Sequence, residues 1–225
     1  MRPPSRPRPR ALWWRPRFVH KTAGQVRRLT GRDPYRDWFA AADLTTDWTS
    51  GNFASWRMVL SAWRSEPLRI LEIGSWEGRS ALFFLNFFPR STIVCVDYFA
   101  DNDTLADLCL VEERFDRNLA PFAGRVEKIK SHSLPALERL AEENRRFDLV
   151  YLDANHTYDL VMKNTVRLWP LTEPGSVIIW DDYRWGRELP QGQRAKGAID
   201  AFLRAHAGGY RLLRKDYQVM VERLK

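Results

Sequence analysis

The stretch Ile70–Ser80, ILEIGSWEGRS, decides the fold of this chain. Its first half is an apolar run typical of a buried strand, and its second half predicts a tight turn before a helix that begins near Ser80. Gly74 and Gly78 allow the backbone to approach a ligand closely, and the start of the helix offers free N–H groups to a carboxylate or a phosphate. We therefore expect a strand, a ligand-binding turn and a helix in that order.

The spacing of the two glycines argues against a nicotinamide dehydrogenase. The pattern is G-x-x-x-G, without the G-x-G-x-x-G that a dinucleotide pyrophosphate requires. Glu72, inside the strand, would repel a pyrophosphate, whereas it could hold the ammonium group of an amino-acid moiety. The alternative is an ordinary strand–turn–helix without a ligand.

Outward from this motif, apolar strand candidates alternate with helix candidates, as in a βαβ protein. The expected strands are 68–74, 92–99, 126–129, 147–153 and 176–180, and the expected helices are 80–88, 104–119, 134–144, 158–168 and 196–206. The ending YRLLRKDYQVMVERL predicts two strands with a turn near Lys215–Asp216. Before the first strand, residues 37–64 predict two short helices with aromatic side chains that pack on the core. The pattern indicates a doubly wound α/β sheet with one antiparallel insertion.

Charge divides the chain into an arm and one folded domain. The 225 residues suffice for a single well-buried α/β domain, and the net charge is +8. Residues 1–36 hold eleven basic residues and one acid, a net charge of +10, so the remaining 189 residues carry 25 basic and 27 acidic side chains, a net charge of −2. We expect 1–36 to be a disordered, Arg/Pro-rich basic arm and 37–225 to be one domain.

The composition of the arm and the cysteine count bear on location and partners. Alternating Arg and Pro cannot sustain a helix, and no apolar segment long enough for a secretory signal follows. The alternative to a solvated arm is contact with nucleic acid or an anionic membrane, with Trp13 and Trp14 as interfacial anchors. No apolar run approaches the ~20 residues that span a bilayer. Two cysteines, Cys95 and Cys109, cannot form a disulfide framework, which fits a cytoplasmic protein.

Polar residues at the ends of the second and third strand candidates suit an adenosine group. Asp97 ends an apolar strand roughly 20 residues past the glycine turn, where a carboxylate can accept from both ribose hydroxyls. Tyr98 or Phe99 could then lie along an adenine ring. Ser131 and His132 are expected near the adenine edge, although His132 reads equally well as a surface histidine at a helix start.

The segments YLDANHTYD and IIWDDYRW place carboxylates where two further strands stop. Three hard oxygen ligands, from Asp153, Asp181 and Asp182, suit Mg²⁺, which keeps waters and binds substrate oxygens. Such an ion lowers the pKa of a coordinated hydroxyl, and His156 could take the proton at neutral pH. The alternative is a solvated acidic turn that precedes a helix.

Together LEIGSWEGRS, VCVDYF, LDANHTYD and PGSVIIWDDY resemble the class I S-adenosylmethionine-dependent methyltransferases, specifically methyltransferase family 24. The match runs from about Asp47 to the C-terminus. It implies a Rossmann-like seven-stranded sheet, mostly parallel with an antiparallel C-terminal strand, and S-adenosyl-L-methionine as methyl donor. The cofactor-binding residues expected from the motifs and the resemblance together are Glu72, Gly74, Ser75, Gly78, Ser80, Asp97, Tyr98, Ser131, His132 and Asp153.

The resemblance also bears on the reaction. In catechol O-methyltransferase and its relatives a catalytic lysine lies three residues after the first metal-binding aspartate. His156 has that spacing here, as in several sugar-hydroxyl methyltransferases, and the pair Asp181–Asp182 resembles those relatives more than the Asp-Asn of the catechol enzymes. We expect Mg²⁺-assisted O-methylation of a small hydroxylated acceptor, sugar or natural-product like. Asp153 and His156 are the catalytic candidates, and Asp153, Asp181 and Asp182 are the expected metal ligands.

Two other functions stay open at this point. One is a non-methylating enzyme of the cephalosporin hydroxylase type, which shares much of this motif set. The other is a degenerate methyltransferase body that acts as a binding protein through its basic arm. The sequence names no acceptor, and it leaves assembly into a homo-oligomer open.

Overall fold

The computed structural model describes residues 35–99 and 110–225 of the chain. Nearly all of the predicted arm, the first part of the helix expected over 104–119, and Cys109 lie outside these residues. Within the described part, no helix combines the length and the apolar character needed to cross a membrane.

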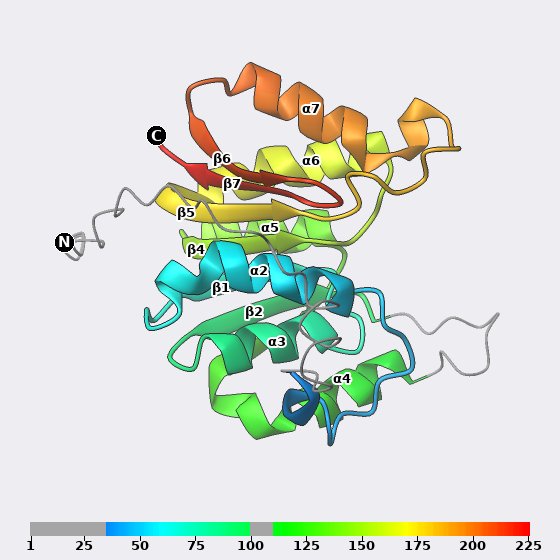
Figure 1. Ribbon diagram of the computed structural model, residues 1–225, viewed down its shortest axis with the longest axis vertical. Coiled ribbons are helices and arrows are strands. Elements are labelled where there is room, and N and C mark those ends of the chain that lie inside the picture. The colour runs from blue at the N-terminus through cyan, green and yellow to red at the C-terminus, as the bar shows by residue number, and fades with distance from the viewer. Residues whose placement is uncertain (1–34, 100–109) are drawn as a thin grey trace, which may run out of the picture.

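Seven strands form one sheet in the order β3-β2-β1-β4-β5-β7-β6 (Figure 1). They are β1 (Arg69–Ile73), β2 (Thr92–Asp97), β3 (Val126–Lys130), β4 (Phe147–Leu152), β5 (Thr172–Trp180), β6 (Tyr210–Lys215) and β7 (Val219–Arg223). Neighbours among the first five strands are parallel, and β7 is antiparallel to both β5 and β6. This topology confirms the predicted doubly wound, mostly parallel sheet with an antiparallel C-terminal strand.

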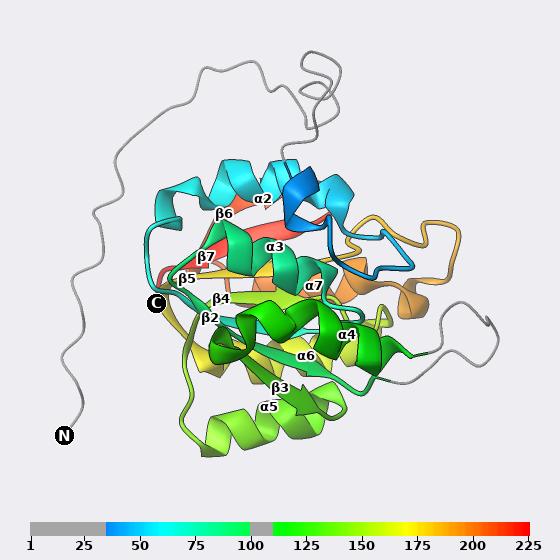
Figure 2. The same cartoon turned by 90° about the horizontal axis from the view of Figure 1, so that it is seen from below.

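Helices cover both faces of the sheet, which is why its strands are apolar on both sides. The α-helices among the described residues are α2 (Phe53–Leu60), α3 (Arg79–Phe87), α4 (Val111–Leu119), α5 (Ser133–Glu142), α6 (Tyr158–Leu168) and α7 (Ala195–Ala205). Helices α2, α3 and α4 lie on one face, and α5, α6 and α7 lie on the other (Figure 2). Successive residues of β1 alternate between the two layers: Ile70 packs on the α3 side and Leu71 on the α5 side.

The segment before β1 differs from its prediction. Instead of two short helices, residues 36–63 form one α-helix, α2, and short 3₁₀ turns at Arg36–Trp38, Ser50–Asn52 and Ser61–Trp63. The expected aromatic packing is present: the ring centroids of Phe53 and Phe83 are 4.4 Å apart, and those of Trp56 and Phe84 are 4.7 Å apart. These aromatic contacts pack α2 against α3.

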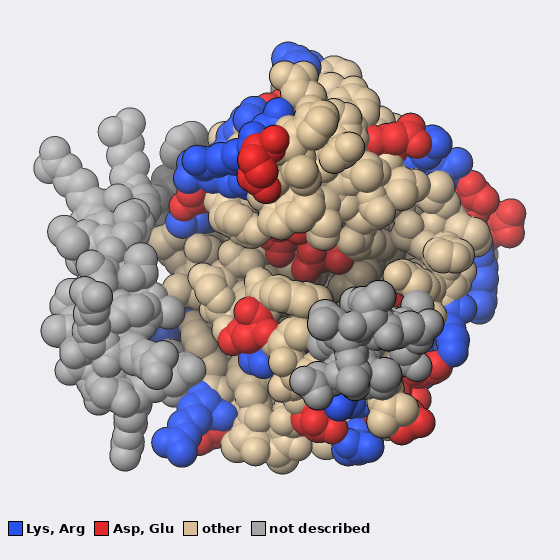
Figure 3. Space-filling model, turned by 90° about the vertical axis from the view of Figure 1, so that its right-hand side faces the viewer, with Lys and Arg blue, Asp and Glu red and all other residues tan. Residues whose placement is uncertain are grey.

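The order of the strands places a topological switch between β1 and β4. The chain leaves β1 toward β2 and β3 on one side and then returns to the other side of β1 as β4. Ligands of open α/β sheets bind at such a switch, beyond the carboxyl ends of the strands. Figure 3 faces this edge of the molecule and shows a hollow with acidic side chains inside it.

Candidate active site

The turn after β1 adopts the conformation that its glycines permit. Gly74 and Gly78 have φ angles of +92° and +86°. A Cβ atom on Gly74 would clash with the backbone carbonyl of Asp153, so the turn lies directly against the chain that leaves β4. A Cβ on Gly78 would lie 2.5 Å from Cδ2 of Leu119. Glycine at position 78 therefore lets the turn pack directly on Leu119 of α4, and the contact of its backbone with a ligand stays a prediction.

Asp97 holds the glycine turn from the end of β2. Its Oδ2 accepts hydrogen bonds from the backbone N–H groups of Ser75 and Trp76, at 2.9 and 2.8 Å, and its Oδ1 accepts one from Phe99 at 2.9 Å. Trp76 has a φ of 48°, a left-handed conformation that costs a non-glycine residue energy. The bonds to Asp97 stabilise this conformation, so Asp97 shapes the turn.

Glu72 is a fully buried carboxyl under the same turn. Burial raises its pKa to about 7, and the neighbouring Ser80 and Ser75 hydroxyls and the Cys95 thiol offset only part of that effect. Oε1 of Glu72 and Oγ of Ser75 are buried without a hydrogen-bond partner. An unpaired buried polar atom costs about 1–3 kcal/mol. These two atoms, one in β1 and one in the glycine turn that follows it, indicate a place for a ligand with hydrogen-bond donors.

The residues predicted at the adenine edge lie together. The Tyr98 and His132 rings stack with centroids 5.2 Å apart and planes inclined by 22°. The N–H of Ser131 donates to the backbone carbonyl of Asp97 at 2.9 Å, which brings the ends of β2 and β3 into contact. Tyr98 is 54% exposed, whereas Phe99 is buried. Of the two rings considered for the adenine, only Tyr98 is therefore accessible.

Asp153, His156 and Asp182 form a compact group at the ends of β4 and β5. One ligand atom from each lies within 4.8 Å of the others. The His156 Nδ1 atom is 2.8 Å from Oδ2 of Asp182. Burial alone would lower the pKa of His156, but the hydrogen bond to Asp182 and the charges of Asp182 and Asp181 raise it. Burial and the same two charges raise the pKa of Asp153 well above its usual range.

Asp181, the third predicted metal ligand, is bonded to neighbouring groups inside the protein. Its Oδ2 accepts from the side-chain amide of Gln218 at 2.7 Å and contacts the Tyr151 hydroxyl, and its Oδ1 accepts from the N–H of Asp182 at 2.7 Å. The Asp181 side chain is buried and both of its oxygens are engaged inside the protein. Asp181 thus lies beside the three-residue group, joined to Asp153 through the Tyr151 hydroxyl, and its role as a metal ligand stays a prediction.

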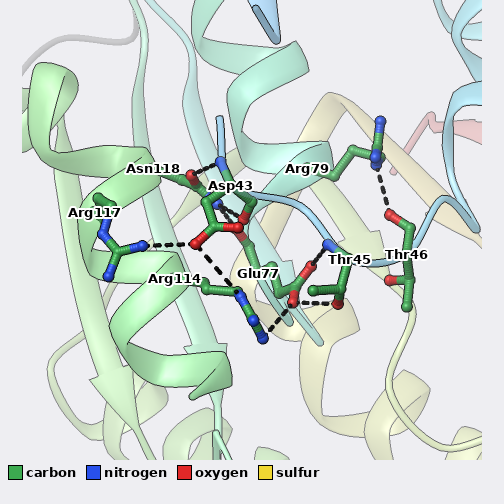
Figure 4. Close-up of polar contacts among 8 residues, drawn as sticks. All are labelled: Asp43, Thr45, Thr46, Glu77, Arg79, Arg114, Arg117 and Asn118. Carbon is green, nitrogen blue, oxygen red and sulfur yellow. Dashed lines mark hydrogen bonds and ion pairs between the residues drawn. The ribbon is translucent and has the colours of Figure 1, made fainter. Parts of the chain in front are cut away.

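The structure adds Glu77, which sequence reasoning missed, to the residues that shape the turn (Figure 4). Its buried carboxylate accepts from the N–H and the hydroxyl of Thr45 at 2.7 and 2.6 Å and lies 3.5 Å from Arg114. The Asn118 amide bridges the carbonyls of Glu77 and Asp43 at 2.9 Å each. These contacts fasten the chain before α2 to the glycine turn and α4. The signal in the sequence is an acid within the glycine turn, but its partner Thr45 lies 32 residues away.

A family model described as a methyltransferase domain matches residues 71–183, half of the chain. The chain belongs to this methyltransferase family. The matched residues extend from β1 to the turn after β5, so they contain both the glycine turn and the Asp153–His156–Asp182 group.

Individual proteins resemble this methyltransferase more distantly. The mycinamicin VI 2''-O-methyltransferase of Micromonospora griseorubida is 28% identical over 127 residues, which are 53% of this chain and 28% of that protein. The chain thus spans less than a third of that relative's length. The MycE methyltransferase solved in complex with Mg and SAH has a TM-score of 0.61 and 20% identity, over 85% of this chain and 53% of that one. The Bacillus cereus O-methyltransferase in complex with SAH has a TM-score of 0.61 and 17% identity, over 84% and 88%. These structures share the fold.

Proposed function

We propose that this chain is an S-adenosyl-L-methionine-dependent O-methyltransferase that acts on a small hydroxylated acceptor. One observation supports this most: the glycine turn and the Asp153–His156–Asp182 group touch. The N–H of Asp153 donates to the carbonyl of Ile73 at 2.8 Å, and Gly74 packs on the Asp153 backbone. A methyl donor in the turn and an acceptor on the acidic group would therefore be held in contact, which is the main requirement of a transfer reaction.

The glycine turn fits the cofactor chemically. The unpaired oxygens of Glu72 and Ser75 suit the ammonium group of the methionine end, and the first turn of α3 suits its carboxylate. The Asp97 carboxylate, which has about four lone-pair sites, can accept ribose hydroxyls in addition to its backbone donors. Tyr98 and His132 supply flat faces for the adenine. S-adenosylmethionine brings a methyl group already activated by the sulfonium, so the protein has to position the acceptor and remove its proton.

The acidic group fits Mg²⁺. Asp153 and Asp182 are hard oxygen ligands at neighbouring strand ends. Burial, and then the charges of Asp181 and Asp182, raise the pKa of Asp153, and a bound cation would offset both effects. Mg²⁺ would lower the pKa of an acceptor hydroxyl bound to it. MycE, solved with Mg and SAH, shows that a protein of this fold can hold both. In this proposal Asp153 and Asp182 are the ligands, and Asp181 supports them from within the protein.

His156 is the proposed general base. Its Nδ1 faces the Asp182 carboxylate at 2.8 Å, so Nδ1 carries the proton and Nε2 keeps its lone pair. Nε2 can accept the proton of the acceptor hydroxyl, and Asp182 stabilises the resulting imidazolium. The same hydrogen bond raises the pKa of His156 and makes it a stronger base.

A sugar or a sugar-bearing natural product is the proposed acceptor. The half-exposed Trp185 ring lies 5.0 Å from the His156 ring and offers a flat apolar surface beside the proposed base. Two adjacent hydroxyls would chelate a cation held by Asp153 and Asp182. The relative named for 2''-O-methylation of mycinamicin VI is consistent with such an acceptor.

Calorimetric titration of S-adenosylhomocysteine tests this function. We expect micromolar binding by the wild-type protein and at least tenfold weaker binding by Asp97→Ala, because the ribose loses its acceptor and the glycine turn loses the carboxylate that holds it. Asp159→Ala, an exposed acid on α6, is the matched control and should bind like the wild type. Absence of binding by the wild type would contradict the proposal and favour a non-methylating relative or a binding protein.

A further inference from the structure

Tyr217 reaches the acidic group from the turn between β6 and β7, which none of the sequence motifs includes. Its hydroxyl donates to Oδ1 of Asp182 at 2.7 Å, across 35 residues of sequence. The side chain is 41% exposed, so core packing does not account for its position. The hydrogen bond brings the antiparallel hairpin to the edge of the sheet where the parallel strands end.

The Asp182 carboxylate is consequently held from two sides. Oδ1 accepts from Tyr217, and Oδ2 faces Nδ1 of His156 at 2.8 Å. The Asp182 backbone has a φ of 56°, which few non-glycine residues adopt. The conformation at the end of β5 is therefore unusual, and the two contacts fix the direction in which its carboxylate points.

The hairpin turn that carries Tyr217 is itself anchored on both sides. Before it, Asp216 forms ion pairs with Arg184 at 2.7 Å and with Arg214 at 3.0 Å. After it, the buried Gln218 accepts from the indole N–H of Trp56 at 2.6 Å and donates to Asp181 at 2.7 Å. The residues on either side of Tyr217 therefore bind residues at the end of β5, where Asp182 lies. These contacts hold the Tyr217 side chain near Asp182.

We propose that Tyr217 is a positioning residue of the active site, which orients Asp182 for cation binding and keeps it in place when His156 takes a proton. This inference rests on the proposed function, because it assumes that Asp182 is a ligand. A carboxylate has about four lone-pair sites, so the bond from Tyr217 leaves room for a cation and for His156. Partners that orient a metal ligand typically change metal affinity 10- to 100-fold when they are removed.

Mn²⁺ titration of the full chain saturated with S-adenosylhomocysteine, followed by electron paramagnetic resonance, tests the inference. Tyr217→Phe removes only the hydroxyl, and we expect it to weaken Mn²⁺ binding about tenfold and to change the spectrum of the bound ion. Tyr210→Phe removes a hydroxyl from the same hairpin outside the site and should leave both unchanged. Thermal unfolding and S-adenosylhomocysteine affinity should match the wild type in both variants.

The outcomes separate this inference from the proposed function. Equal Mn²⁺ affinity in Tyr217→Phe and the wild type would overturn the role of Tyr217 and leave the methyltransferase proposal standing. Wild-type protein that binds S-adenosylhomocysteine but no Mn²⁺ would overturn both the metal site and this inference. Wild-type protein that fails to bind S-adenosylhomocysteine would contradict the methyltransferase proposal itself.

Discussion

At the scale of single residues, the buried Glu72 carboxylate lowers the stability of the ligand-free protein but suits a ligand that carries an ammonium group. Burial raises its pKa from an ordinary value of 4.5 to about 7. Between these two values the folded protein binds more protons than the unfolded chain, so the free energy of unfolding falls as the pH rises through this window and stays low above pH 7. An ammonium group beside the carboxylate would offset that loss.

Glu72→Gln should therefore stabilise the ligand-free protein, and more so at high pH. We expect the gain in the free energy of unfolding to be about 2 kcal/mol larger at pH 8 than at pH 5, because only the wild type has to bury a charge at pH 8. The same variant should bind S-adenosylhomocysteine less tightly. Urea unfolding at the two pH values measures the first effect, with Glu138→Gln on the exposed face of α5 as control. A gain that does not depend on pH would show that the Glu72 carboxyl titrates normally.

The sequence predicted the site residues that directly follow apolar strands. Asp97, Asp153 and Asp182 lie where expected, because the carboxyl ends of parallel strands meet at one edge. It did not predict Glu77 or Tyr217, whose partners are 32 and 35 residues away and depend on how loops fold back. Asp182 also has a left-handed backbone conformation, with a φ of 56°, that its residue type does not reveal.

At the scale of elements, a chain of buried hydrogen bonds joins α2, the β6–β7 hairpin and the end of β5. The Trp56 indole donates to Gln218, and Gln218 donates to Asp181. The Tyr151 hydroxyl contacts Asp181 and lies 2.7 Å from Oδ2 of Asp153, so the chain extends to the proposed metal group. The β6–β7 hairpin thus extends the sheet and also holds Asp181 beside the site through Gln218.

Gln218→Ala tests this support. The substitution leaves the Trp56 N–H and one Asp181 oxygen buried with fewer partners, so we expect the free energy of unfolding to fall by about 1–3 kcal/mol. Gln193→Ala, in the exposed 3₁₀ turn Gln191–Gln193, should change it by less than about 0.5 kcal/mol. Urea unfolding at neutral pH measures both. A loss no greater than that of the control would show that these bonds contribute no net stability.

At the scale of the whole molecule, the alternation of strands and helices predicted the sheet and its helices to within a few residues at each end, except that α4 begins at Val111 and residues 104–109 of its predicted range lie outside the described part. Helix α6 (Tyr158–Leu168) has the expected bounds, because a polar segment sets its start and a proline follows its end. The helices of the chain before β1 were harder to predict. Its aromatic side chains indicate that the segment packs on the core, but they do not indicate which residues form a helix. The cytoplasmic location, the assembly state and the partners of the arm stay predictions.

The measurement that tests the central claim most directly asks whether the methyl donor and the cation lie side by side. S-adenosylmethionine labelled with ¹³C at its methyl group is bound to the full chain, and its methyl resonance is recorded with Mg²⁺ and then with paramagnetic Mn²⁺. Because the glycine turn touches Asp153, we expect Mn²⁺ to broaden the resonance of the bound methyl strongly, and Asp153→Asn to abolish the broadening. A bound methyl resonance that stays sharp while Mn²⁺ is bound would contradict the account.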